Sequence, residues 1–117
     1  INFSSDLGII SPNQNIYSKN SVKPLVYSIS KHGIIGMTKY FGTLFAKKGI
    51  RVNSICFGGV YNKKFDKQFV NKFAKLIPME RMCYIEEILS PINFLLDYKN
   101  SYMTGHSLII DGGRTIW

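Results

Sequence analysis

Tyr27 and Lys31 are the residues whose types and spacing most directly suggest acid–base chemistry. Side chains four positions apart on a helix share a face, so the lysine ammonium would lie near the phenol. A positive charge at about 4 Å, with an effective dielectric constant of about 20, favours the phenolate by roughly 4 kcal/mol. The pair therefore suits a tyrosine that exchanges protons near neutral pH. An exposed ring beside a solvated lysine is the alternative, and this pattern alone leaves both open.

Three other short segments carry the small or polar residues that often line ligand sites. They are Ser4–Ser5, Gly58–Val60 and Asp111–Gly113, and each follows a stretch with the apolar pattern of a strand. In open α/β sheets, ligands bind beyond the carboxyl ends of the parallel strands. We therefore expect these segments and Tyr27 to share one edge of a sheet.

The elements that must position these residues alternate between strands and helices. Strand patterns occupy residues 1–5, 50–56 and 106–110. Helical patterns occupy residues 24–48, a lysine-flanked stretch that ends before Pro78, and residues 85–96, where Pro91 should introduce a kink. This order predicts an α/β fold, a partial Rossmann-like doubly wound parallel sheet. Residues 6–24 have no hydrophobic period and are expected to form a long loop.

The longest predicted helix begins at Pro24 and is ended by Gly49. Apolar residues occur on both of its sides: Ile34, Met37, Phe41, Leu44 and Phe45 on one, and Ile29, Ile35 and Tyr40 on the other. Gly33 and Gly36 leave room for another backbone. We therefore expect this helix to be buried on two sides.

Taken together, the motifs resemble the carboxyl-terminal half of a short-chain dehydrogenase/reductase. The stretches that carry the resemblance, in the family's order, are Ile1–Gly8, Tyr27–Lys31, Gly49–Ile55, Gly58–Val60, Ser101–Gly105 and Asp111–Gly113. They cover nearly the whole chain. The resemblance implies an oxidoreductase that uses NAD or NADP to transfer a hydride between nicotinamide and a carbonyl or alcohol substrate.

The resemblance also implies a role for each matching catalytic residue. Ser5, three positions before Gly8, matches the serine that hydrogen-bonds the reacting oxygen, whereas Ser4 is expected to point elsewhere. Tyr27 matches the general acid/base. Lys31 matches the lysine that makes this tyrosine more acidic and holds the nicotinamide ribose, so Tyr27 and Lys31 are expected to bind the cofactor as well.

The loop after the second predicted strand resembles the family's nicotinamide-binding loop. Gly58 and Gly59 would let the backbone approach the nicotinamide, and a main-chain amide near Val60 would meet its carboxamide. Asn62 stands where the family often has a threonine and is the remaining cofactor-binding candidate. Phe57 stands where the family usually has proline. Without the resemblance, the same residues would be a simple turn between a strand and a helix.

Other residues of these motifs are expected to be structural. Asn53, Thr104–Gly105 and Asp111–Gly113 match positions that shape the sheet and often a contact between subunits. Tyr17 is not expected to be a second catalytic tyrosine, because Ser21 rather than a lysine stands four residues later.

The segment from Ser11 to Lys23 is longer than the family's usual spacing between serine and tyrosine. Its larger polar residues are Asn13, Gln14, Asn15, Tyr17, Lys19 and Lys23. Such an insertion beside the active site suits a large polar substrate, for example an activated or acidic sugar. In this respect the chain is similar to family members of bacterial surface-sugar pathways.

Residues 1–117 are interpreted as a single partial domain without the family's amino-terminal, dinucleotide-binding half. The chain opens on Ile1, and Ile1–Phe3 has the pattern of a strand end, so we expect a fragment of a longer protein. Alone, it should bind dinucleotide poorly and show little turnover. The alternative is a non-catalytic remnant of a truncated gene that retains only a subunit-pairing surface between Ile29 and Phe45. The coding DNA upstream would separate the two hypotheses.

The charge balance raises a further hypothesis, since 15 basic residues against 7 acidic ones give a net charge of +8. The densest basic run consists of Lys63, Lys64, Lys67, Lys72 and Lys75. These lysines alternate with apolar residues at helical spacing, as on one solvated helix face, so no nucleic-acid partner is expected. A basic mouth for an anionic substrate or cofactor fits equally well.

Other functional classes find little support in the composition. Cys56 and Cys83 are too few and too far apart for a disulfide framework or a cysteine-based zinc site, and His32 and His106 lack partners at metal-ligand spacing. No apolar run approaches the roughly 20 residues that a membrane helix needs. We therefore expect a cytoplasmic protein with no metal, no membrane partner and, by resemblance, a homo-oligomeric state.

Overall fold

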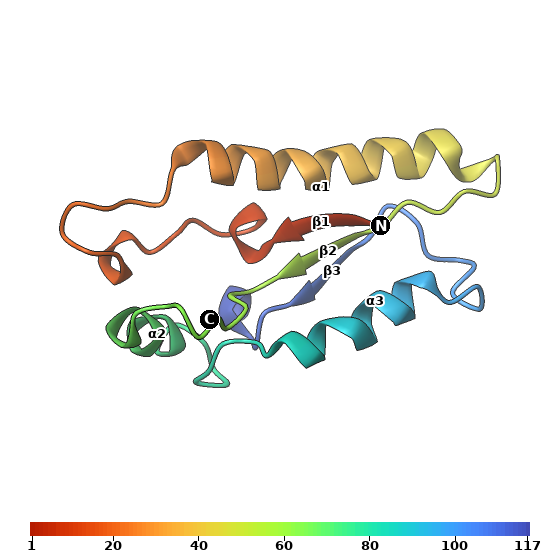
Figure 1. Cartoon of the computed structure of the whole chain (residues 1–117). Helices are drawn as coiled ribbons and strands as arrows, with labels where there is room; N and C mark the ends of the chain where they lie inside the picture. Colours follow the sequence, from red (N-terminus) through yellow and green to blue (C-terminus); the bar gives the residue numbers. More distant parts are fainter.

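The computed structural model describes all 117 residues and consists of one parallel sheet with helices on both faces (Figure 1). Its strands are β1 (Asn2–Ser5), β2 (Ser54–Phe57) and β3 (Ser107–Ile110), in the spatial order β1-β2-β3. Helix α1 (Leu25–Ala46) covers one face, and α2 (Lys67–Ala74) and α3 (Leu89–Leu96) lie on the other. This arrangement confirms the predicted α/β class.

The strand register brings the predicted site segments to one edge. Ser5 pairs with Phe57, and Phe57 pairs with Ile110, so the three parallel strands end at the same level. The central strand is the most buried, with Ile55 and Cys56 both 0% exposed. The segments that follow the strands therefore emerge side by side, as the sequence predicted.

The second strand is shorter than predicted, because it begins at Ser54 rather than at residue 50. The preceding residues bond mainly to the loop before β3, although the Asn53 carbonyl still accepts from the Asn2 N–H of β1 at 2.9 Å. The Val52 N–H donates to Thr104 Oγ1 at 3.1 Å, and Asn53 Oδ1 accepts from the His106 N–H at 3.0 Å. These contacts agree with the structural roles expected for Asn53 and Thr104.

Helix α1 is buried on one side only, which corrects the expectation of two buried sides. Thr38 and Gly42 face the sheet and are its buried residues. A Cβ on Gly42 would lie 2.7 Å from Gly105 Cα, so this close approach requires glycine. The exposed apolar side chains of α1 are Leu25, Val26, Ile29, Met37, Tyr40 and Leu44. Within the chain, α1 packs on β1, β2 and the turn Asp6–Gly8, and no helix or strand lies against its outer face.

The two shorter helices refine the predicted boundaries. Asp66 caps α2 by accepting a hydrogen bond from the Phe69 N–H at 3.0 Å. The predicted helix over residues 85–96 is a 3-10 turn, Ile85–Ile88, followed by α3. Pro91 thus falls in the first turn of α3, where the backbone N–H that proline lacks has no partner within the helix. None of the helices combines the length and apolar character that a membrane span requires.

The predicted loop over residues 6–24 contains ordered turns and a core residue. Asp6–Gly8 and Gln14–Ile16 each form a 3-10 turn. Ile16 is 5% exposed and packs with Phe73, Ile77 and Met82 of the α2 region. The insertion is therefore anchored to α2 by an apolar cluster, which its weak periodicity did not indicate.

Candidate active site

A cavity of about 490 Å³ opens at the carboxyl edge of the sheet. Its walls come from the end of β1, the insertion, the first turn of α1, the loop after β2, and α2. Of the residues predicted for the site, Ser5, Tyr27, Gly58, Gly59 and Val60 all line it. The structure thus brings together side chains from three separate segments.

Ser5 ends β1 and is 6% exposed. Its Oγ caps the following 3-10 turn by accepting from the Leu7 N–H at 3.2 Å, and its hydroxyl donates to Asp6 Oδ1 at 2.8 Å. The neighbouring Ser4 hydroxyl instead donates to the Lys31 carbonyl at 2.8 Å. Ser4 therefore points toward α1, as expected, and Ser5 is the hydroxyl held by the turn.

Tyr27 lies in the first turn of α1, where its half-buried ring forms part of the cavity wall. One turn further on, Lys31 Nζ lies 5.6 Å from the ring centroid and donates to the Phe3 carbonyl at 3.0 Å. Lys23 Nζ lies closer, at 3.7 Å from the same centroid. Two ammonium groups therefore lie near the Tyr27 ring, one from the insertion and one from α1.

The loop after β2 is held in place by backbone hydrogen bonds to Cys83. The Tyr61 N–H donates to the Cys83 carbonyl at 2.7 Å, and the Cys83 N–H donates to the Gly59 carbonyl at 2.9 Å. The Val60 N–H between them makes no hydrogen bond within the chain. A Cβ on Gly59 would lie 2.5 Å from the Phe73 ring. The packing of this loop against α2 therefore requires glycine at position 59, whether or not a ligand approaches the loop.

Asn62 is one of two predicted site residues that the structure leaves outside the cavity wall. Its side-chain oxygen accepts from the Lys64 N–H at 2.9 Å, which shapes the turn before α2. Lys31 also does not line the cavity, although its ammonium lies near the Tyr27 ring.

Two polar cavity residues, Asp6 and Arg114, were missed as functional candidates by sequence reasoning. Asp6 and Arg114 form an ion pair at 2.5 Å, with side chains 3% and 4% exposed. Tyr17, set aside as a catalytic tyrosine, also lines the cavity. Burial raises the pKa of the Tyr17 hydroxyl, so it remains a hydrogen-bond donor at neutral pH. The available signals were the position of Asp6 next to Ser5 and that of Arg114 after the paired glycines.

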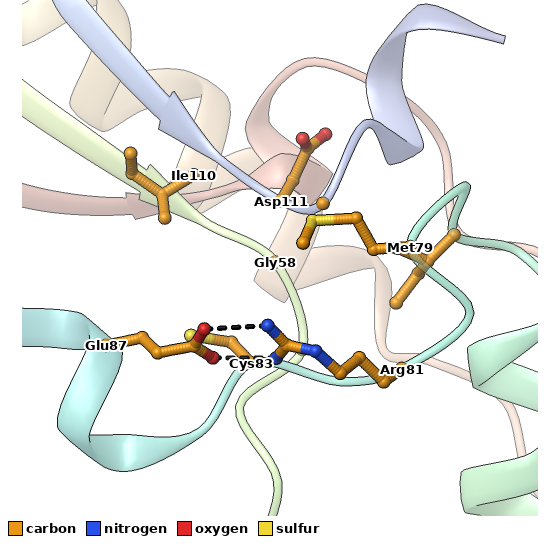
Figure 2. A pocket seen from close by; sticks show the side chains of 10 residues that line it. Gly58, Met79, Arg81, Cys83, Glu87, Ile110 and Asp111 are labelled. Atoms are coloured by element: carbon orange, nitrogen blue, oxygen red, sulfur yellow. Dashed lines mark hydrogen bonds and ion pairs between the residues drawn. The ribbon is translucent and has the colours of Figure 1, made fainter.

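A second cavity, of about 90 Å³, lies toward α3 and contains a different ion pair (Figure 2). Arg81 and Glu87 form two hydrogen bonds of 2.7 Å there. The Arg81 guanidinium holds the pKa of the Glu87 carboxyl down to about 2. Burial raises the pKa of the nearby Cys83 thiol, which disfavours the thiolate. No group of three or more His, Cys, Asp or Glu side chains could hold a metal ion.

The family described as Enoyl-(Acyl carrier protein) reductase matches residues 10–115. The chain belongs to the short-chain dehydrogenase/reductase family. A relative in this family, the short-chain dehydrogenase srdC of Neurospora crassa, is 35% identical over 96 residues, which cover 77% of this chain and 35% of srdC.

Solved structures agree with the assignment to the short-chain dehydrogenase/reductase family. A short-chain dehydrogenase from Leptospira borgpetersenii, solved with bound NAD+, matches with a TM-score of 0.91 and 36% identity over 98% of this chain and 43% of that protein. ElxO with bound NADP matches with a TM-score of 0.78 and 28% identity over 97% of this chain and 44% of that protein. The chain thus spans less than half the length of these relatives.

Proposed function

We propose that this chain is the carboxyl-terminal catalytic half of a NAD(P)-dependent oxidoreductase that interconverts a carbonyl compound and an alcohol. The observation that carries this proposal is the shared cavity, in which Ser5, Tyr27 and Gly58–Val60 meet at the carboxyl edge of the parallel sheet. This edge is where open α/β sheets bind their ligands. Membership of the family supports the same reaction class.

In carbonyl reduction, the proton and the hydrogen bonds come from this chain. The Tyr27 hydroxyl gives its proton to the carbonyl oxygen, and the Ser5 hydroxyl donates a hydrogen bond to that oxygen as negative charge develops. Lys31 stabilises the phenolate that Tyr27 becomes, since its ammonium lies 5.6 Å from the ring centroid. Alcohol oxidation is the reverse, with the Tyr27 phenolate accepting the alcohol proton.

The loop after β2 fits a nicotinamide cofactor. The Val60 N–H is a donor without a partner in the chain, which suits a carboxamide oxygen, and the loop carries no side chain at Gly58 and Gly59. When bound, the nicotinamide supplies or accepts the hydride that this chain has no group to carry. We propose NAD or NADP as the cofactor, with Tyr27 and Lys31 at its ribose. Asn62 shapes the turn rather than the cavity wall, which argues against a direct contact.

The cavity composition favours a polar, anionic substrate such as an acidic or phosphorylated sugar derivative. The insertion contributes Tyr17 and Lys23, and the Lys23 ammonium forms no ion pair within the chain. Phe65, Phe69 and Phe73 also line the cavity, and the Tyr17 ring lies beside that of Phe69, with their centroids 5.8 Å apart. A pyranose ring has apolar faces and polar edges, so an aromatic wall beside polar groups suits it.

The relatives extend well beyond the part that this chain matches, and we propose that the pyrophosphate-binding residues belong to that remainder. The 117-residue chain alone should therefore bind NADH or NADPH only weakly. The exposed apolar side of α1 would pair with a second subunit of the complete enzyme, because large exposed apolar surfaces mark interfaces. Micromolar dinucleotide binding by residues 1–117 alone would contradict the proposal that the pyrophosphate-binding residues lie in the remainder of the protein.

The experiment that tests the function uses the native-length protein and a panel of carbonyl compounds. The panel pairs neutral ketones and aldehydes with oxidised sugars that carry a carboxylate or phosphate, and NADH or NADPH consumption is followed by absorbance. We expect turnover of an anionic sugar derivative and a loss of about 10²–10⁴-fold in the Tyr27→Phe variant, the usual contribution of a general acid. A Tyr40→Phe variant on the outer side of α1 is the control. Undiminished turnover by Tyr27→Phe would refute the assignment of the proton donor.

A further inference from the structure

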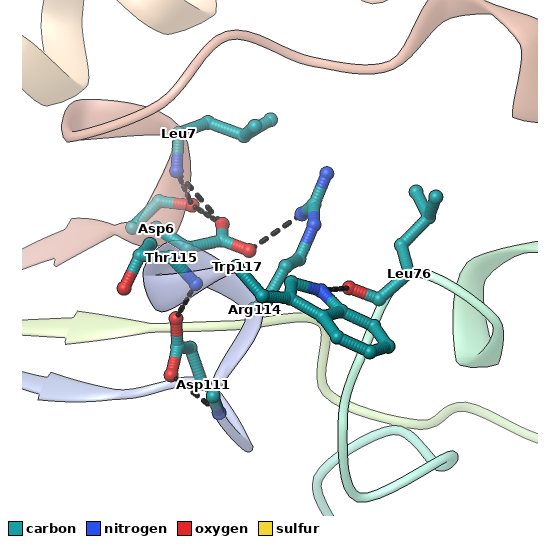
Figure 3. Close-up of polar contacts among 9 residues, drawn as sticks. Asp6, Leu7, Leu76, Asp111, Arg114, Thr115 and Trp117 are labelled. Atoms are coloured by element: carbon teal, nitrogen blue, oxygen red, sulfur yellow. Dashed lines mark hydrogen bonds and ion pairs between the residues drawn. The ribbon is translucent and has the colours of Figure 1, made fainter.

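A buried ion pair joins the two ends of the chain directly beside the catalytic serine (Figure 3). Asp6 follows Ser5 in sequence, whereas Arg114 lies 108 residues away from Asp6, in the segment after β3. Both residues are at most 5% exposed, and both line the main cavity. A buried ion pair costs desolvation free energy, so a pair at this position calls for a specific reason.

The Asp6 carboxylate also holds the Ser5 hydroxyl. Asp6 Oδ1 accepts from Ser5 Oγ and from the Leu7 N–H, both at 2.8 Å, and Asp6 Oδ2 accepts from Arg114. A serine hydroxyl has one proton to donate and two lone pairs. Here the Ser5 hydroxyl donates its proton to Asp6, and one of its lone pairs accepts from the Leu7 N–H. The second lone pair of Ser5 Oγ remains available to a ligand.

Arg114 is itself fixed by the structure around it. Its guanidinium carbon lies 4.7 Å from the centroid of the Phe73 ring. The turn that carries it is capped by Asp111, whose carboxylate accepts from the Gly113 N–H at 2.9 Å and from the Thr115 N–H at 2.7 Å. The Trp117 indole N–H donates to the Leu76 carbonyl at 3.1 Å and ties the same segment to the end of α2 (Figure 3).

We propose that Asp6, held in place by Arg114, is a positioning residue that fixes the place of the Ser5 hydroxyl oxygen for the reaction. This inference rests on the proposed function, because it concerns how Ser5 meets the reacting oxygen. In the structure the Ser5 proton is donated to Asp6. When a carbonyl binds, the Ser5 O–H turns toward its oxygen, and Asp6 keeps its bonds to Arg114 and to the Leu7 N–H. Asp6 thereby holds the turn in which the Leu7 N–H donates to Ser5 Oγ at 3.2 Å, so Oγ stays in place and no covalent bond changes.

The test uses the native-length protein and the carbonyl substrate of highest turnover in the panel. Asp6→Asn keeps the side-chain shape but removes the charge. We expect kcat to fall at least tenfold while the KM for the dinucleotide stays within twofold. In a Ser5→Ala background the same change should leave kcat within twofold, because Asp6 acts through the serine. An equal loss in both backgrounds overturns the proposal. Glu87→Gln, which breaks the other ion pair, is the control and should leave kcat within twofold.

Asp6→Asn leaves Arg114 as an unpaired buried charge, so the variant can lose activity by unfolding. The double variant Asp6→Asn with Arg114→Met removes both charges and separates positioning from stability. We expect its kcat to stay as low as that of Asp6→Asn while its thermal unfolding midpoint returns toward wild type. Recovery of kcat together with the midpoint shows a purely structural pair and overturns the proposal. Arg114→Lys, which keeps the charge, should retain more activity than Arg114→Met.

If the wild-type protein converts nothing in the panel, the proposed function fails, and the contact is then judged by stability. Ser5→Ala and Asp6→Asn are combined in a double-mutant cycle of thermal unfolding. Non-additive shifts of the unfolding midpoint support an energetic coupling between Asp6 and Ser5, and additive shifts overturn it. The two failures are therefore distinguishable.

Discussion

The ammonium nitrogen of Lys23 lies 3.7 Å from the centre of the Tyr27 ring. Lys23 belongs to the insertion, so the segment before α1 places a positive charge against the face of the tyrosine that is proposed to transfer the proton. A cation over an aromatic face gains about 0.5–2 kcal/mol and keeps its N–H donors available to an anion. Lys23 is therefore suited to bind a charged group of the substrate at the mouth of the cavity.

Replacing Lys23 by Met should weaken binding of anionic substrates selectively. The expected effect is a roughly tenfold rise in KM, since about 1.4 kcal/mol is a typical value for a partly desolvated charge contact. Two substrates that differ only by a carboxylate or phosphate are compared in the native-length protein. Lys19→Met is the matched control, because Lys19 is exposed in the same insertion and does not line the cavity. An equal rise for the neutral substrate would show that the positive charge is not the cause.

Gly59 should not tolerate alanine. A Cβ at Gly59 would lie 2.5 Å from the Phe73 ring, and such overpacking costs about 1–3 kcal/mol. The free energy of unfolding from denaturant titration of the native-length protein checks this value. A Gly59→Ala variant as stable as the wild type would contradict the close packing of α2.

The insertion should lose its anchor when Ile16 is shortened. Ile16 is 5% exposed in a cluster with Phe73, Ile77 and Met82, so Ile16→Ala should cost about 2–5 kcal/mol. Val22 is 68% exposed in the same insertion, and Val22→Ala serves as the control. Hydrogen exchange should show faster exchange around residues 14–17 in Ile16→Ala alone. Unchanged exchange there would mean that the insertion is held by other contacts.

The Arg81–Glu87 pair sets a pH dependence whose sign follows from the lowered pKa of Glu87. That pKa is about 2 in the folded protein, because Arg81 and the Tyr84 N–H bond the carboxylate. The unfolded value is about 4.3, so the stabilisation is complete above about pH 4.3 and is lost as the pH falls through the folded value. In Arg81→Met, the Glu87 pKa should rise toward its usual range. Carboxyl-carbon NMR titration measures this directly, and an unchanged Glu87 pKa in the variant would exclude Arg81 as the cause.

Local patterns were sufficient to predict the sheet and the long helix. Ile55 and Cys56 lie in an alternating segment bounded by glycines, and they form the fully buried centre of β2. Gly49 was predicted to end the long helix, and it has the positive φ of 71° that favours glycine after a helix. These signals depend on neighbouring residues alone, so the sequence displays them directly.

Features that depend on distant contacts were not predicted. Asp6 and Arg114 are 108 residues apart, and no spacing rule connects two such residues before the fold is known. Ile16 is a single apolar residue in a polar insertion, so its burial against α2 leaves no periodic signal. The second buried side predicted for α1 needs groups that this chain does not place there. Apolar patterning indicates that a helix face tends to be buried, but it does not identify the element or subunit that buries it.

Trp117 gives the molecule a natural optical reporter. It is the sole tryptophan of the sequence, and it is tied through its indole N–H to the same segment that carries Arg114. Detachment of that segment would free the ring and alter its fluorescence. Within residues 1–117, the emission of Trp117 should therefore report whether the segment that carries Arg114 stays attached to the residues after α2.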